Sequence, residues 1–110
     1  MSISHIVLFQ FKPDVAQESI RAACERMLLL KDQCLHPSSQ KPYIITSIGG
    51  RDNSIEGAQN GISHAFVVEF RSAADRDYYV REDPVHKEFV RSLDGLVERA
   101  QVIDFTNTVL

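Results

Sequence analysis

Apolar residues recur at every second position near the start of the chain and again past its middle, which is the period of a β-strand. In the segment 3–11, one face is formed by Ile3, His5, Val7, Phe9 and Phe11. In the segment 62–70, one face is formed by Ile62, His64, Phe66, Val68 and Phe70. The opposite faces are apolar too, because they carry Ile6, Leu8, Ala65 and Val67. Both predicted strands therefore need cover on two sides.

The period changes to that of a helix between these two strands. Asp14 follows Pro13 and is a candidate cap for the first helix, with Gln17 three residues further on. The apolar stripe of this helix is formed by Ile20, Ala23, Cys24, Met27 and Leu28. We expect the helix to end before Pro37, in a connector rich in turn-forming residues.

The remaining patterns complete the order of elements. Further strands are predicted at 43–48 and 101–105, and further helices at 72–80 and from Asp83 to Gly95. The order strand, helix, strand, strand, helix, strand is typical of an α+β, ferredoxin-like split β-α-β fold. We therefore predict one domain, residues 1–110, in which helices cover one face of a four-stranded antiparallel sheet. The uncovered apolar face predicts a homodimer that packs through its sheet faces.

Charge and composition narrow the class of partner. The chain carries 12 Lys and Arg against 15 Asp and Glu, a net charge of −3 that offers no attraction to nucleic acid. No apolar stretch reaches the roughly 18 to 20 residues needed to cross a membrane, and the first residues lack the order of a signal peptide. We therefore predict a cytoplasmic protein without membrane or nucleic-acid partners, in which Cys24 and Cys34 are free thiols.

Three histidines occupy positions that point toward the predicted core. His5 and His64 lie on the apolar strand faces, and His86 is at the third position of the helix that Asp83 begins. Polar groups in an apolar interior are the composition of a small-molecule pocket. The helix N-terminus disfavours a charged imidazolium, so His86 is predicted to be neutral and able to accept a proton. The alternative for each histidine is a structural role with a local hydrogen bond.

Two adjacent tyrosines, Tyr78 and Tyr79, come shortly before His86. A phenol that polarises a ketone while a histidine removes an adjacent proton supports enolisation or aldol closure without a cofactor. Either tyrosine can face the pocket, and the alternative role for both is aromatic packing. Three histidines are also a possible metal site. No HxxxH or histidine–carboxylate motif accompanies them, so we predict neither a metal nor a cofactor.

Four segments resemble the stress-response A/B barrel domain family, also called dimeric α+β barrels: residues 5–12, 64–70, 77–90 and 102–105. The resemblance implies a ferredoxin-like protomer that pairs through its sheet. Many members have no assigned activity, and others are polyketide cyclases of the olivetolic acid cyclase type, which close a ring by aldol condensation. By this resemblance His86 is the base, His5 and His64 are further cavity histidines, and the carbonyl donor is Tyr78 or Tyr79. The same resemblance makes Val7, Phe9 and Phe66 pocket walls, to which we add Met27 and Phe89 from the helices.

Two hypotheses about function follow. The first is a stress-response homodimer with a pocket for a small hydrophobic ligand and no assigned activity. The second is a cofactor-independent lyase or polyketide cyclase that acts on a polyketide-like compound. A metal or haem oxygenase on a related scaffold is a third alternative. Because one scaffold hosts unrelated reactions, the geometry of the site has to decide between them.

Overall fold

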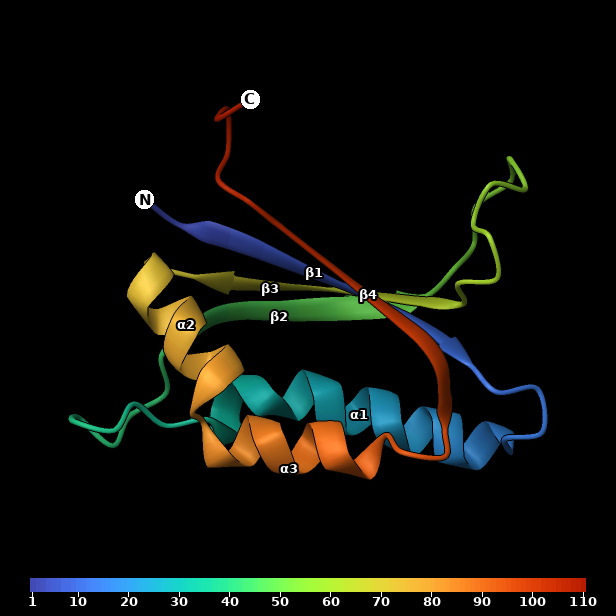
Figure 1. The fold of residues 1–110 in the computed structure, drawn as a ribbon, viewed down its shortest axis with the longest axis horizontal. Helices are drawn as coiled ribbons and strands as arrows, with labels where there is room; N and C mark the ends of the chain where they lie inside the picture. The colour runs from blue at the N-terminus through green and yellow to red at the C-terminus, as the bar shows by residue number, and fades with distance from the viewer.

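The computed structural model describes all 110 residues as one four-stranded antiparallel sheet with three helices against one of its faces (Figure 1). The strands are β1 (Ile3–Phe11), β2 (Ile44–Arg51), β3 (His64–Phe70) and β4 (Val97–Phe105). The helices are α1 (Gln17–Gln33), α2 (Ala73–Arg81) and α3 (Pro84–Ser92). This is the ferredoxin-like α+β fold predicted from the order of elements.

The strand order β2-β3-β1-β4 places β1 in the middle of the sheet. Val7 of β1 lies opposite Phe66 of β3 on one side and Val102 of β4 on the other. Since cross-strand partners share a face, this row of residues points toward the helices. The alternation predicted for β1 is confirmed, because every second residue from Ile3 to Phe11 is buried.

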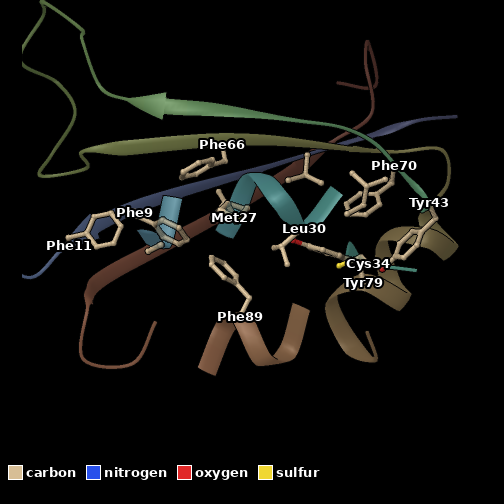
Figure 2. Packing of buried hydrophobic residues seen from close by; sticks show 14 residues of the cluster. Phe9, Phe11, Met27, Leu30, Cys34, Tyr43, Phe66, Phe70, Tyr79 and Phe89 are labelled. Carbon is tan, nitrogen blue, oxygen red and sulfur yellow. The ribbon is translucent and has the colours of Figure 1, made fainter. Parts of the chain in front are cut away.

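The hydrophobic core fills the space between the sheet and the helices (Figure 2). Phe66, Phe70 and Tyr79 are fully enclosed, and Met27 and Leu30 of α1 meet them from the helical side. Each buried side chain of this size contributes about 1.5 to 3 kcal/mol relative to an exposed one. Cys24 and Cys34 are free, as predicted.

Three local expectations need correction. Helix α1 begins at Gln17, with Ala16 as its N-cap and no side-chain cap, because Asp14 lies in a turn before the helix. Leu30 takes the buried place expected of Leu28, since Ala23, Met27 and Leu30 continue one face of the helix. Strand β4 begins at Val97 rather than residue 101, and its first half is exposed, so no hydrophobic alternation marks it.

The face of the sheet away from the helices is apolar and exposed. We call it the outer face, and it comprises Ile6, Leu8, Ile48, Ala65, Val67, Ile103 and Phe105. Ile48 is 63% exposed and Ile103 is 57% exposed, although both lie opposite apolar partners in the sheet. The C-terminus extends from the sheet on this same side (Figure 1). None of the helices is long and apolar enough to cross a membrane.

Candidate active site

A cavity of about 520 Å³ lies between the β1–β4 half of the sheet and helices α2 and α3. Its apolar wall is formed by Val7, Phe9, Met27, Phe89, Leu93 and Val102. Its polar groups gather at the other end and include His5, Arg76, Asp77, Tyr79, His86 and Asp104. A volume of this size, with a mainly apolar wall and few polar groups, is typical of sites for small organic ligands.

Tyr79 and His86 lie face to face at the wall of this cavity. Their ring centroids are 3.9 Å apart and the ring planes differ by 27°. The Tyr79 side chain is fully buried, and neither its hydroxyl nor Nδ1 of His86 has a hydrogen-bond partner in the protein. A buried polar atom without a partner costs about 1 to 3 kcal/mol. Such unpaired atoms are rare in folded proteins and call for a specific explanation.

The protonation states of these two groups follow from their burial. Burial lowers the pKa of His86 below its ordinary value of 6.5, and the raising effects of the Tyr79 backbone and the Asp83 carboxylate do not offset that decrease. Burial raises the pKa of the Tyr79 hydroxyl above its ordinary value of 10.0. At neutral pH the pair therefore consists of a neutral imidazole, which can accept a proton, and a protonated phenol, which can donate a hydrogen bond.

His5 is held by a carboxylate from the neighbouring strand. Nδ1 of His5 lies 2.6 Å from Oδ1 of Asp104, which is its partner in the β1–β4 register. The second oxygen of Asp104 accepts from Nη1 of Arg76 at 2.9 Å, and Arg76 also donates to Asp77 at 2.7 Å. A carboxylate on one ring nitrogen fixes the tautomer of a histidine. Nδ1 of His5 then carries the proton, and Nε2 is the basic nitrogen.

His64 shares a sheet face with His5 but lies at the other end of the sheet. It pairs with Phe9 in the β1–β3 register, its ring meets Phe11 edge-on, and Nδ1 lies 2.8 Å from the Ser63 hydroxyl. Burial lowers its pKa, and the charge of Arg51 adds to that effect. His64 therefore stands outside the cavity that contains His5 and His86.

Two further predicted site residues also lie away from the cavity. Tyr78 turns toward Tyr43 and His36, with ring centroids 5.6 and 6.3 Å away. The ring of Phe66 packs over Gly49 of β2, where a Cβ atom would collide with it and lie 2.5 Å from the Ala65 carbonyl oxygen. Glycine at position 49 thus leaves room for Phe66 in the core, and Phe66 does not line the cavity.

The histidines are too dispersed to form the metal site considered from the sequence. No group of three or more His, Cys, Asp or Glu side chains in the structure is arranged to hold a metal ion. The cavity instead joins two histidines, one tyrosine and two carboxylates, those of Asp77 and Asp104. These are groups for hydrogen bonding and proton transfer.

A comparison with protein families settles the ancestry of this fold. The model of the stress-responsive A/B barrel domain matches residues 3–107. The chain belongs to this family. No curated protein matches it in sequence.

Solved structures agree with the A/B barrel assignment. The Arabidopsis thaliana protein At3g17210 is 27% identical, with a TM-score of 0.82 over 98% of this chain and 97% of that one. A hydroxynitrile lyase from Passiflora edulis is 21% identical, with a TM-score of 0.83 over 99% and 96% of the two chains. A dimeric protein with a ferredoxin-like fold from Bacteroides fragilis is 21% identical, with a TM-score of 0.66 over 94% of each chain.

The A/B barrel fold brings to the cavity two residues that the sequence did not single out. Asp104 and Arg76 are ordinary surface residue types, separated from His5 by most of the chain. The one signal that points to Asp104 is its place opposite His5, and that requires the β1–β4 pairing. Arg76 can be recognised as a site residue only when α2 is known to lie beside β4, where Arg76 donates to Asp104.

Proposed function

We propose that this A/B barrel domain is a cofactor-independent lyase or cyclase, which makes or breaks a carbon–carbon bond beside a carbonyl group in a small hydrophobic compound. The observation that carries this proposal is the unpartnered pair, the Tyr79 hydroxyl and the His86 ring nitrogen, at the wall of an apolar cavity. A ligand oxygen and an acidic C–H or O–H group supply the missing partners.

The proposed reaction is a proton transfer followed by bond formation. Tyr79 donates a hydrogen bond to the substrate carbonyl oxygen, while His86 accepts a proton from the adjacent carbon. The electron pair of that C–H bond becomes an enolate, which attacks a second carbonyl carbon of the same molecule. His86 then returns its proton to the new alkoxide oxygen, so the aldol product forms with no net change in protons. Nε2 of His5, fixed by Asp104, accepts a hydrogen bond from a substrate hydroxyl.

The strand register gives the cavity two chemically different ends. The row His5–Asp104 lies at one end, and the row Phe9–Ala100 lies two residue pairs further along the same face. Helix α3 runs in the same sense, from His86 to Leu93. A substrate with an oxygen-rich head and an apolar tail fits this polarity, which is the character of a polyketide-like β-polycarbonyl compound.

The similar Passiflora edulis structure carries the name hydroxynitrile lyase. That name denotes a lyase whose substrate, a hydroxynitrile, has a carbon–carbon bond next to a hydroxyl group. It supports the class of chemistry proposed here, whereas the substrate of the present chain is inferred from its own cavity. Cyanohydrins therefore belong in the substrate panel beside β-polycarbonyl compounds.

Turnover of such a panel tests the proposal. For any substrate that the wild-type protein converts, His86→Ala is expected to lower kcat/KM about 10²- to 10⁴-fold, the usual contribution of a general base. His64→Ala is the matched control and should leave turnover unchanged, since His64 lies outside the cavity. Activity should also fall as the pH drops through the lowered pKa of His86, because the imidazolium cannot accept a proton. A His86→Ala protein that converts every substrate at the wild-type rate would refute the base assignment.

A second candidate is ligand binding without turnover. It is favoured by the burial of both unpartnered atoms, because a base without exposed surface cannot approach a substrate C–H bond unless its side chain moves. Thermal-shift measurements with the same panel separate the two functions. Compounds that raise the Tm but are recovered unchanged identify a binding protein, and compounds that are converted identify an enzyme.

We further propose that the homodimer forms through the outer face. Similar solved proteins are dimeric with the same ferredoxin-like fold. Ile103 of the outer face is exposed and lies opposite Ile6 in the sheet, so the two side chains form an apolar surface.

Ile103→Glu is expected to convert the dimer to a monomer, because a carboxylate is costly to bury in an apolar interface. Light scattering coupled to size exclusion measures the mass. Leu29→Glu, on the exposed side of α1, is the control of similar exposure and should stay dimeric. A dimeric Ile103→Glu protein would place the interface elsewhere.

A further inference from the structure

A buried carboxylate lies at the junction of α2 and α3, the two helices that line one side of the cavity. Asp83 is only 1% exposed. Oδ2 accepts a hydrogen bond from the Tyr43 hydroxyl at 2.6 Å, and Oδ1 accepts from the backbone N–H groups of Val85 at 2.9 Å and His86 at 3.3 Å. None of the ion pairs in the structure involves Asp83. Its charge is thus held by neutral donors alone.

Helix capping alone does not explain a charge at this position. Asn, Ser and Thr cap helices about as well as Asp, and Ser72 caps α2 in this same chain by accepting from the Asp75 N–H at 3.1 Å. A neutral cap avoids the cost of removing a carboxylate from water. The positive end of α3 offsets part of that cost. The retained charge nevertheless calls for a role that an uncharged cap cannot fill.

Asp83 is tied to the end of α2 and to the first turn of α3, the two helices that carry Tyr79 and His86. Its own N–H donates to the Tyr78 carbonyl at 2.9 Å, which fixes it to the end of α2 next to Tyr79. Its side chain binds the backbone N–H of His86, so it sets the first turn of α3. Tyr43 and Cys34 gather at the same end of the core as Tyr79 (Figure 2). Burial and the nearby Asp83 carboxylate raise the pKa of the Cys34 thiol, so this thiol stays protonated.

We propose that Asp83 is a positioning residue, which aims His86 at the cavity through its cap and stabilises the positive charge that His86 acquires on accepting a proton. This inference rests on the proposed role of His86 as the base. Tyr43 and the first N–H groups of α3 hold the carboxylate in place, so its charge stabilises the imidazolium without the free-energy cost of reorganising solvent. The arrangement gives the base a counter-charge that never contacts the substrate.

The other groups that surround His86 act in different directions. Around the cavity these are His5 on β1, Asp104 on β4, and Arg76, Asp77, Tyr79 and Arg81 on α2. Burial lowers the pKa of His86, whereas the Tyr79 backbone and, to a smaller extent, the Asp83 carboxylate oppose that decrease. Arg76 is neutralised by Asp77 and Asp104. Among these groups, Asp83 is the one that also binds the His86 backbone.

The test is an NMR titration of the His86 ring in the full-length protein without substrate. Asp83→Asn and Asp83→Ser each retain a capping oxygen but remove the charge. In both variants the titration midpoint of His86 is expected to move to lower pH, as expected for loss of a nearby opposite charge. Asp94→Asn is the matched control, because it removes an exposed carboxylate just beyond the far end of α3 and should leave the midpoint unchanged.

The outcomes separate this inference from the proposed function. Midpoints that stay in place or move to higher pH in the folded Asp83 variants would overturn the role of Asp83, whatever the activity of the protein. A downward shift supports that role even if no substrate is converted. Where a substrate is known, the acidic limb of the rate profile should move in the same direction in Asp83→Asn, a change that a purely structural cap would not produce.

Discussion

Tyr79→Phe is expected to yield a protein that is more stable than the wild type and almost inactive. The Tyr79 hydroxyl is fully buried and has no partner in the protein. Removing it relieves a desolvation cost and should stabilise the fold by about 1 kcal/mol. The same change removes the donor to the substrate carbonyl, and losing one such donor typically lowers kcat about 10²- to 10³-fold. Stability and activity should therefore change in opposite directions.

Denaturant unfolding and turnover of the same preparation measure both effects. Tyr78→Phe is the matched control, since Tyr78 precedes Tyr79 in the chain but turns toward Tyr43 and His36. It should leave turnover unchanged. A destabilised Tyr79→Phe protein would mean that the hydroxyl has a partner within the fold. An active Tyr79→Phe protein would remove the carbonyl donor from the mechanism.

The opposing effects of Tyr79 also show why a stability argument alone misses this site. A core selected only for packing would place phenylalanine at position 79, as it does at Phe66, Phe70 and Phe89. Retaining a hydroxyl there weakens the fold and gains nothing unless a ligand uses it. The same reasoning applies to Nδ1 of His86, which is buried and unpartnered in the first turn of α3.

Strand periodicity predicted the sheet well where both faces are apolar. β1 and β3 are central strands, so burial leaves a clear alternation in their residues. β4 is an edge strand with an exposed first half, and polar residues such as Glu98 and Arg99 erase the pattern there. The start of α1 was misplaced for a related reason, because Asp14 has the chemistry of a cap but lies in the preceding turn.

The site was predicted in part, and the limit is geometric. His5 and His86 were identified because imidazole stands out on an apolar face, and the structure brings both to one cavity. His64 has the same sequence signature, yet it lies opposite Phe9, four residues along β1 from His5. Periodicity assigns a face but not a position along it. The choice between Tyr78 and Tyr79 depended on the rotation of α2, which its short and polar sequence does not reveal.

Asp104→Asn is expected to disable His5 while leaving it in place. The carboxylate holds Nδ1 at 2.6 Å and so keeps the proton on that nitrogen. An asparagine that turns its NH₂ group toward His5 favours the opposite tautomer, in which Nε2 carries the proton and can no longer accept from the substrate. Loss of such an orienting partner should lower kcat/KM at least about tenfold.

Nitrogen NMR shifts of the His5 ring report the tautomer directly, and turnover reports its consequence. Asp75→Asn is the matched control, since Asp75 lies on the same helix as Arg76 but does not line the cavity and forms no ion pair. It should change neither the His5 tautomer nor the rate. If Asp104→Asn reverses the tautomer while turnover persists, His5 has no part in the reaction. If the tautomer itself is unchanged, Arg76 and the sheet, rather than the carboxylate, must orient His5. Asp104 of β4 is linked to the chemistry at Tyr79 and His86 only if Asp104→Asn both reverses the His5 tautomer and lowers the rate of turnover.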